Sequence, residues 1–532
     1  MKNLRLHHYL TIALTLIAMA SLAHAQTYTE LYNFDCVNDG CSPYQPGLLA
    51  QGQDGSLSGT LPSQIFGNGT AFNYTLSGVF TRLYEFPDPA SAPQSGLSLG
   101  FDGNLYGAAE TGGPARKGTV FKISAGVTTV LHTFTDGADG AFPFAPPIQA
   151  PDGNIYGVTS SGTNPGKAYK ITPSGTFSVI ATLPYATQAP LILGADGKLY
   201  GTTPYGGTSS RGTFFQMTTA GKVKVIYNFG SDSVVPIGPV LQASDGKFYG
   251  TTWGGGTGGQ GIVYQLTTGG VYKVLHNFQS ATDGAASTSG LVQGSDKFLY
   301  GVASAGGANG FGTLFKINTT GTTFAVLHNF DKSNGATPFA TPTLHTNGKI
   351  YGVTQTGGSK NSTYGDIYSF DNGLKPFASL VVIWSGKVGT SVGILGQGFL
   401  TATGVKFGTG PGTFKVINDS YMTATPTAGA TTGNVTVLEP GGNLVTPQIF
   451  KVIPAVSAFS PTSGPVGTQV VITGMSLQQT SGVKIGGVKV TSFTVNSNTQ
   501  VTATVPVGAV TGTIVVTTKG GSVIAPGTFT VN

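Results

Sequence analysis

The segment DGKLYGTT, residues 196–203, is one of seven related segments in this chain and shows how each copy is built. It is followed by TFFQMT at residues 213–218 and KVKVIYNF at residues 222–229. These short runs are rich in β-branched and aromatic residues and are separated by turn residues, as β-strands are. We predict strands at residues 190–195, 198–203, 213–218 and 222–229, with Asp196-Gly197 as a type I′ turn between the first two.

Copies of this pattern follow one another from residue 27 to about residue 380. The first turn of each copy is marked in order by Gly55, Gly103, Gly153, Gly197, Gly246, Lys297 and Gly348. The repeat is therefore about 49 residues long, and it lacks the 3.6-residue periodicity of helical repeats. Four short strands in a period of this length are typical of a β-propeller blade.

The two ends of the repeat region are complementary. A lone copy of the fourth strand, LYNF at residues 31–34, precedes the first repeat, whereas the last repeat has a poor fourth strand at residues 375–380. We predict a seven-bladed propeller with four-stranded blades, closed by the N-terminal strand, which removes the exposed sheet edges. The alternative is eight blades, in which the lone strand is a degenerate first copy.

A different repeat begins after residue 378. The sequence SGKVGT at residues 385–390 returns as SGPVGT at residues 463–468. Alternating Val and Thr with frequent Gly predicts a small β-sandwich, present twice. The predicted organisation is a signal peptide at 1–25, a propeller at 26–378, and sandwiches at 379–453 and 454–532.

Composition supports an all-β fold. Only 9% of the residues are charged, and the chain contains 82 Gly and 30 Pro, which disfavours long surface helices. A hydrophobic content of 39% excludes a disordered chain. The net charge of +6 comes from scattered residues rather than basic runs, so we expect no nucleic-acid binding.

The N-terminus has the features of a secretory signal. Lys2 and Arg5 precede an apolar run at residues 10–22, and Ala23-His24-Ala25 fits a cleavage site. We expect an exported protein, extracellular, on the cell surface or periplasmic, without a transmembrane segment in the mature chain. In an oxidising compartment Cys36 and Cys41 favour a disulfide over a metal site.

Two resemblances cover almost the whole mature chain. Through segments such as DGNLYG (102–107) and GTVFKI (118–123), residues 27–380 resemble the bacterial GloVer (Gloeo_Verruco) tandem repeat. Through FSPTSGPVGT (459–468) and VVITG (470–474), the tail resembles IPT/TIG domains, which implies that its two sandwiches are immunoglobulin-like. The first tail copy departs from that pattern, because VVIW at residues 381–384 replaces the Ser-Pro-Thr approach. The repeat resemblance implies an exported or surface-displayed protein and assigns no reaction.

The histidines of the mature chain do not indicate catalysis. His132, His276 and His328 share one position of the fourth strand, where other copies have Tyr, so we expect structural roles. His345 precedes a turn, and we expect it to be exposed. No Gly-x-Ser-x-Gly elbow between a strand and a helix is present, and no His/Cys/Glu group has metal-ligand spacing, so we predict no catalytic residue and no metal ligand.

The best candidates for ligand binding lie in the connections that share one face of a propeller. They are Trp253, Tyr205, Arg116, Arg211, Asp136 and Asp139. Aromatic rings with neighbouring polar groups suit sugars, which stack on a π-face and form hydrogen bonds at their edges. The alternative is that these residues only stabilise turns and loops. The two aspartates also suggest a calcium site, because Ca²⁺ prefers carboxylate ligands. No single loop supplies enough ligands, so we expect no cofactor.

Two functions remain open from the sequence. The first is a non-enzymatic protein whose propeller binds a glycan or a surface protein, with the sandwiches as spacers or attachment modules. The second is a polysaccharide-degrading lyase or hydrolase with its site on the propeller face. Scarce His and acidic residues favour the first. Neither function predicts the oligomeric state.

Overall fold

The computed structural model describes residues 26–43, 49–62, 69–86, 92–160, 165–230, 233–360, 363–381 and 385–532. The predicted signal peptide, residues 1–25, lies outside this part of the chain. Within it the protein is all-β, and the only helical element is the single 3-10 turn η1 (Phe399–Thr401). No helix in the described ranges combines the length and the apolar character needed to cross a membrane.

Antiparallel strands of the repeat region form seven four-stranded sheets among the described residues, numbered here in chain order. Sheet 1 contains β2 (Ala50–Gln51), β3 (Leu57–Leu61), β4 (Thr70–Tyr74) and β5 (Phe80–Glu85). Sheet 2 contains β6 (Leu97–Leu99), β7 (Leu105–Ala109), β8 (Thr119–Ser124) and β9 (Val127–Thr133). Sheet 3 contains β10 (Ile148–Gln149), β11 (Ile155–Val158), β12 (Lys167–Ile171) and β13 (Phe177–Thr182).

The next three sheets have the same order. Sheet 4 contains β14 (Ile192–Leu193), β15 (Leu199–Thr203), β16 (Thr213–Met217) and β17 (Val223–Asn228). Sheet 5 contains β19 (Leu241–Gln242), β20 (Phe248–Thr251), β22 (Ile262–Leu266) and β23 (Tyr272–Asn277). Sheet 6 contains β24 (Val292–Gln293), β25 (Leu299–Ala303), β26 (Thr313–Ile317) and β27 (Phe324–Asn329). A short pair, β18 (Ser233–Val234) with β21 (Gly254–Gly255), lies outside these sheets.

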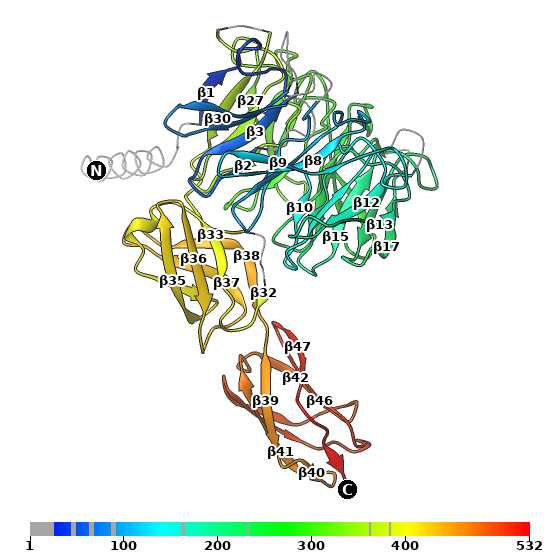
Figure 1. Cartoon of the computed structure of the whole chain (residues 1–532), viewed down its shortest axis with the longest axis vertical. Coiled ribbons are helices and arrows are strands. Elements are labelled where there is room, and N and C mark those ends of the chain that lie inside the picture. Colours follow the sequence, from blue (N-terminus) through cyan, green and yellow to red (C-terminus); the bar gives the residue numbers. More distant parts are fainter. Residues whose placement is uncertain are drawn as a thin grey trace, which may run out of the picture.

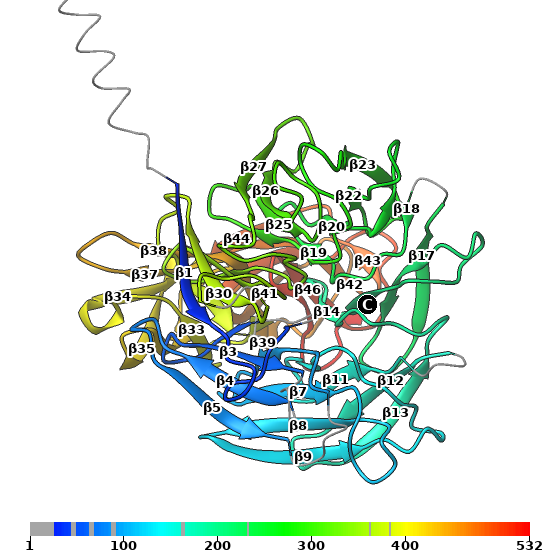
Figure 2. The same cartoon turned by 90° about the horizontal axis from the view of Figure 1, so that it is seen from above.

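Sheet 7 joins the two ends of the repeat region. It contains β28 (Thr343–Leu344), β29 (Ile350–Val353), β30 (Asp366–Asp371) and β1 (Thr27–Asn33). The pairing of β1 with β30 runs from Thr27↔Asp371 to Asn33↔Asp366. The N-terminal strand therefore supplies the fourth strand of the last sheet. Figure 2 shows the sheets following one another round a ring, with β9, β13 and β17 at its outer rim.

Hydrophobic clusters join each sheet to the next, and the cluster that contains Phe34, Leu57 and Tyr351 joins sheet 7 to sheet 1. One recurrent contact is a buried Phe directly after a fourth strand, set at an angle to an aromatic ring in the third strand of the next sheet. The pairs, with ring centroids 5.0–5.9 Å apart, are Phe34–Phe72, Phe86–Phe121, Phe134–Tyr169, Phe229–Tyr264, Phe278–Phe315 and Phe330–Tyr368. This geometry is a favourable one for aromatic pairs.

Packing against the third strand explains why Gly follows Tyr in the second strand of most copies. In sheet 4 a Cβ on Gly201 would lie 2.8 Å from the ring of Phe215 on the neighbouring strand. A side chain at this position would displace the ring, so the repeat pairs a Gly with an aromatic residue.

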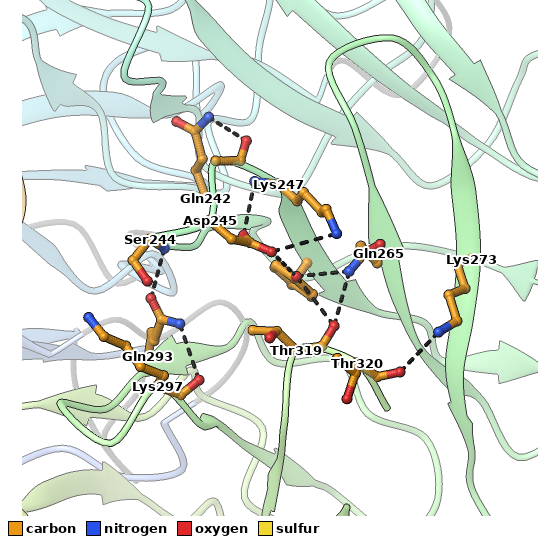
Figure 3. Close-up of polar contacts among 12 residues, drawn as sticks. Gln242, Ser244, Asp245, Lys247, Gln265, Lys273, Gln293, Lys297, Thr319 and Thr320 are labelled. Atoms are coloured by element: carbon orange, nitrogen blue, oxygen red, sulfur yellow. Dashed lines mark hydrogen bonds and ion pairs between the residues drawn. The ribbon is translucent and has the colours of Figure 1, made fainter. Parts of the chain in front are cut away.

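Glutamines tie the first turn of one sheet to the first strand of the next (Figure 3). Gln293 accepts a hydrogen bond from the amide of Ser244 at 2.8 Å and donates to the carbonyl of Lys297 at 3.2 Å. Gln242 accepts from Ala195 in the same way, at 2.8 Å. At the ring closure, Gln51 of sheet 1 accepts from Thr346 of sheet 7 at 3.0 Å.

The predicted strands of sheet 4 are found, but the first is shorter, because its pairing with β15 ends after Leu193. The prediction of a type I′ turn at Asp196-Gly197 is wrong. That turn needs a positive φ at both residues, and only Gly197 has one (φ 79°). Instead, the Asp196 carboxylate accepts hydrogen bonds from the Lys198 amide and the Tyr200 hydroxyl. Lys297 has φ 69°, in the place that Gly occupies in the other copies.

The tail contains two further β-units. The first comprises β31 (Ser379–Val381), β32 (Ser385–Gly386), β33 (Val392–Leu395), β34 (Gly404–Phe407), β35 (Gly410–Asn418), β36 (Tyr421–Pro426), β37 (Gly433–Leu438) and β38 (Leu444–Val452). The second comprises β39 (Ala455–Ser460), β40 (Ser463–Gly464), β41 (Gln469–Met475), β42 (Thr480–Ile485), β43 (Val488–Lys489), β44 (Phe493–Ser497), β45 (Gln500–Thr504), β46 (Ile514–Thr518), β47 (Gly521–Ile524) and β48 (Thr530–Val531). Each unit has its own hydrophobic core. Figure 1 shows them one after the other on one side of the ring.

Candidate functional site

The ring has two unlike faces. The turn face holds the hairpin turns between first and second strands and between third and fourth strands. The loop face holds the connections from second to third strands, called here the inner loops, and from each fourth strand to the next sheet, called here the crossover loops. The first tail unit contacts the turn face: Ser420 donates a hydrogen bond to the carbonyl of Gln53 at 2.9 Å, and Thr346 to that of Gly396 at 3.0 Å. The loop face lies on the opposite side of the ring.

Residues in the left-handed backbone conformation tie the loop face together. Thr337 (φ 56°) donates its amide to the carbonyl of Phe311 in the inner loop of sheet 6 at 2.9 Å. Its own carbonyl accepts from Gln355 in the inner loop of sheet 7 at 3.2 Å. Phe142 (φ 56°) makes the same two bonds, to Lys117 and from Ser160. Such strained conformations persist only where the surroundings over-determine them.

A second set of hydrogen bonds holds the inner loops of sheets 4, 5 and 6. The last residue of several fourth strands is Asn, and its side-chain oxygen accepts an amide hydrogen bond from the inner loop of the same sheet. The pairs are Asn228 with Thr208 at 3.3 Å, Asn277 with Thr257 at 3.0 Å, and Asn329 with Ala308 at 2.8 Å. The Asn of the repeated Asn-Phe pair therefore positions a loop.

Exposed aromatic side chains stand on these fixed loops. Tyr205 is 57% exposed on the inner loop of sheet 4, and Trp253 is 53% exposed on that of sheet 5. The structure adds Phe311 (39%) on the inner loop of sheet 6 and Tyr185 (41%) on the crossover loop into sheet 4. Contiguous patches of exposed apolar side chains are typical of interaction sites, so these four residues are the candidates for such a site.

The two aromatic residues that sequence reasoning missed have weak signals. Phe311 occupies the position of Lys117, Arg211 and Gln260 in other copies, directly before a Gly, and only comparison of the copies marks it as variable. Tyr185 lies over Gly206, where a Cβ would collide with its ring. This contact joins residues from two different repeats.

The six predicted residues fall into two groups. Tyr205, Arg211 and Trp253 lie on the inner loops of the adjacent sheets 4 and 5, and Arg211 is exposed. Arg116 is exposed on the inner loop of sheet 2, and Asp136 and Asp139 lie on the crossover loop that follows sheet 2. The two groups therefore come from sheets on either side of sheet 3.

The two aspartates are engaged in contacts within the protein. Asp136 forms an ion pair with Lys117 at 2.7 Å. Asp139 accepts hydrogen bonds from the Thr135 hydroxyl at 2.7 Å and amide at 3.0 Å and lies 3.2 Å from His132 Nε2. Burial opposes ionisation, but the hydrogen bonds from Thr135 and His132 hold the pKa of Asp139 below its usual value. Within the described ranges no group of three or more His, Cys, Asp or Glu residues converges as a metal site.

The fourth-strand histidines occupy an aromatic packing position, as predicted. His132 stacks on Phe177 at 3.5 Å between ring centroids and His276 on Phe324 at 3.8 Å. Tyr227 stacks on Tyr272 in the same place. Burial lowers the pKa of His276 although Asp283 lies 2.9 Å from its Nε2.

The prediction for His345 is wrong. The side chain is fully buried, with Nε2 3.0 Å from the carbonyl of Gly55 in the adjacent sheet. The turn that contains His345 packs between sheet 1 and the first tail unit, which no local pattern indicates. The predicted disulfide between Cys36 and Cys41 is confirmed, and it lies in the loop that leads from β1 into sheet 1.

Comparison with known families agrees with this architecture. The profile of the Gloeobacter/Verrucomicrobia repeat matches residues 20–190 and 186–414, and that of the IPT/TIG domain matches residues 454–531. The chain belongs to the Gloeobacter/Verrucomicrobia repeat family and ends in an immunoglobulin-like IPT/TIG domain. No curated protein matches the chain.

Solved structures with a similar fold are distant. TolB from Acinetobacter baumannii is 14% identical over 50% of this chain and 62% of its own, with a TM-score of 0.35. The surface glycan-binding protein PbSGBP-B from Prevotella bryantii is 18% identical over 29% and 41% (TM-score 0.24). The periplasmic gluconolactonase PpgL from Pseudomonas aeruginosa is 12% identical over 60% and 97% (TM-score 0.40). At these values the similarities do not bear on what this chain binds.

Proposed function

We propose that the protein is an exported binding protein whose loop face holds a glycan. Its seven sheets are the blades of a seven-bladed propeller over residues 26–378, closed by β1. Residues 379–453 and 454–532 form two immunoglobulin-like units that act as spacer or attachment modules. The N-terminal pattern of residues 1–25 and the disulfide support export into an oxidising compartment.

The observation that supports binding is a set of exposed aromatic rings on loops that the backbone network holds in place. Tyr205 and Trp253 present about half of their surface to solvent although the loops beneath them are hydrogen-bonded. A ligand that stacks on these rings meets a face that is already ordered, so binding costs little loop entropy. The first tail unit leaves this face open, because it contacts the turn face.

Internal pairing of the loop-face carboxylates supports binding over polysaccharide cleavage. A glycosidase needs two carboxyl groups on either side of the scissile bond. Asp136 and Asp139 are held by Lys117, His132 and Thr135, and Asp283 is held by His276 and the amide of Gln279. These contacts engage three of the carboxylates on the loop face, so none of the three stands ready as a free acid or nucleophile.

The test is a polysaccharide panel incubated with the chain from Gln26 to Asn532, in which retained protein and newly released chain ends are measured together. We expect retention without new ends, and loss of retention in Trp253→Ala. A matched control is Val127→Ala, which removes an apolar side chain that is 66% exposed at the start of β9, beside a turn-face hairpin. Release of new chain ends would show that the protein is an enzyme rather than a binding protein. Unchanged retention of the Trp253→Ala variant would show that the binding site lies elsewhere.

A further inference from the structure

We infer that the ligand of the loop face is an uncharged polysaccharide lying across the inner loops of sheets 4, 5 and 6. This inference rests on the proposed function and narrows it to a part of the face and a class of glycan. Three observations lead to it: the continuity of these loops, the aromatic residues on them, and the distribution of charge.

The loops of sheets 4 to 6 form a continuous surface. The crossover loop between sheets 4 and 5 packs Pro236 against Gly212 in the inner loop of sheet 4, and its Val235 carbonyl accepts from the Trp253 amide at 3.2 Å. On the crossover loop between sheets 5 and 6, Ala286 donates its amide hydrogen to the carbonyl of Gln260 at 3.0 Å. The carbonyl of Ala286 accepts a hydrogen bond from the Ser304 hydroxyl at 2.7 Å. Each of the three inner loops therefore adjoins the next through a crossover loop.

This surface presents a series of rings rather than one. Tyr185 and Tyr205 flank the contact at Gly206 on sheet 4, Trp253 follows on sheet 5, and Phe311 on sheet 6. Because these aromatic side chains come from successive sheets, a ligand that contacts all of them must be an extended chain that follows the circle of sheets. A chain of sugar units meets this requirement, with apolar ring faces on the aromatics and hydroxyl groups toward exposed Thr208, Thr257 and Asn309.

Charge is scarce on this part of the face. The inner loops at residues 252–261 and 304–312 contain no charged residue. Asp283, on the crossover loop between them, is only 13% exposed and contacts His276. Arg211 at the edge of sheet 4 is the exposed charge of the three inner loops. A polyanionic glycan would need several cationic partners, as charged ligands usually have.

Charged residues lie instead at sheet 2 and on the crossover loop that follows sheet 6, where Asp331 and Lys332 are exposed. Arg116 and Lys117 lie on the inner loop of sheet 2, and Asp136 pairs with Lys117. Lys117 also lies over the ring of Phe142, at 5.0 Å from its centroid. This part of the face offers ion pairing, and it serves as the internal comparison for the aromatic part.

The experiment measures binding of the Gln26–Asn532 chain to two polymers, an unsubstituted neutral β-glucan or mannan series and polygalacturonate or alginate as polyanions. Tyr205→Ala, Trp253→Ala and Phe311→Ala are compared with Arg116→Ala, and thermal unfolding shows that each variant folds. We expect neutral polymers to bind, each aromatic substitution to weaken binding about ten-fold, and Arg116→Ala to leave it unchanged. Raising NaCl to about 1 M, where the Debye length is about 3 Å, should not release the protein.

Two results would overturn the inference while leaving the proposed function standing. One is binding of polyanions alone, released by salt and weakened by Arg116→Ala. The other is binding of neutral polymers that none of the three aromatic substitutions weakens. Retention by no polysaccharide of either kind would instead overturn the proposed function and this inference with it, in favour of a protein partner.

Discussion

Asp366 is the most unusual single residue of the ring. It is fully buried at the start of β30, where sheets 1, 2, 4 and 6 have Thr70, Thr119, Thr213 and Thr313. One carboxyl oxygen accepts from the Thr354 hydroxyl at 2.7 Å, and the other has no hydrogen-bond partner within the described residues. Burial raises its pKa from 3.8 to about 8, and nearby Glu30 adds to this shift. Burial therefore favours the protonated, uncharged form of Asp366 in the folded protein.

Stability should depend on pH through this residue. The pKa of Asp366 is higher in the folded than in the unfolded protein, so the folded protein binds more protons between pH 4 and 8. The contribution of Asp366 to the free energy of unfolding therefore falls as pH rises through this range. We expect Asp366→Thr to be stabilising relative to wild type by an amount that grows by about 1.4 kcal/mol per pH unit between pH 5 and 7. Thermal unfolding of both proteins at the two pH values measures this. An equal difference at both would show that Asp366 is not protonated.

Loop positioning by strand-end asparagines gives a second prediction at this scale. Asn277→Ala removes the bond to the Thr257 amide, which costs about 1 kcal/mol and frees the loop that holds Trp253. Glycan retention should fall several-fold while the unfolding temperature changes little. Asn318→Ala is the matched control, since Asn318 accepts from the Thr322 amide at 2.9 Å on the turn face. Equal effects of both substitutions on retention would argue against loop positioning.

Among the elements, β1 has the largest consequence, because it comes from the N-terminus and completes sheet 7. Tyr28 on this strand stacks on His328 at 4.0 Å between ring centroids, lies against Tyr368 at 5.4 Å, and donates its hydroxyl to the carbonyl of Asn334. The strand is thus held by pairing with β30 and by side-chain contacts to both sheets 6 and 7.

Weakening β1 should open the ring. Tyr28→Ala is expected to cost about 3 kcal/mol, as large-to-small changes at packed aromatic positions do. The unfolding temperature should fall, and limited proteolysis should cut near the N-terminus first. Thr29→Ala on the exposed side of the same strand should stay within about 0.5 kcal/mol of wild type. Similar behaviour of both variants would mean that closure does not depend on Tyr28.

Much at the element scale was predictable from local pattern. The fourth-strand sequence before the first repeat indicated β1 as a closing strand, and three strands of sheet 4 begin and end within a residue of their predicted positions. The first strand was predicted at residues 190–195 but pairs only at Ile192 and Leu193. Pairing length depends on how the chain leaves the sheet, which the composition of the segment does not show.

At the scale of the whole molecule, the first tail unit is part of the ring's packing. Leu99 and Phe101 of sheet 2 pack against Val381, Leu395 and Tyr421. The second tail unit is joined through Gln479, which exchanges hydrogen bonds of 2.8 and 3.1 Å with the backbone of Thr432. The first tail unit therefore contacts the ring directly, whereas Gln479 joins the second tail unit to the first.

Truncation should separate these roles. A chain ending at Ile453 should unfold at the temperature of the full-length propeller, because only the second tail unit is lost. A chain ending at Ala378 exposes Leu99 and Phe101, and we expect a lower unfolding temperature and greater binding of a hydrophobic dye. Calorimetry of the three lengths measures this, and identical propeller transitions in all of them would show that the first tail unit does not support the ring.

The amino-acid sequence alone determined the repeat, the strand pattern, the disulfide and the aromatic character of Tyr205 and Trp253, because each depends on local spacing or on residue type. Only the tertiary structure decided that Asp136 and Asp139 are paired internally, that His345 is buried, that Tyr185 lies on Gly206 and that the tail leaves the loop face open. The aspartates are held by nearby partners, Asp139 by a histidine seven positions away and Asp136 by a lysine 19 positions away, but residue type and spacing do not show that the loop folds back onto them. His345 instead meets Gly55 across 290 positions, and Ser420 of the tail meets Gln53 across 367. These long-range contacts exist only once the ring has closed and the tail has packed against it.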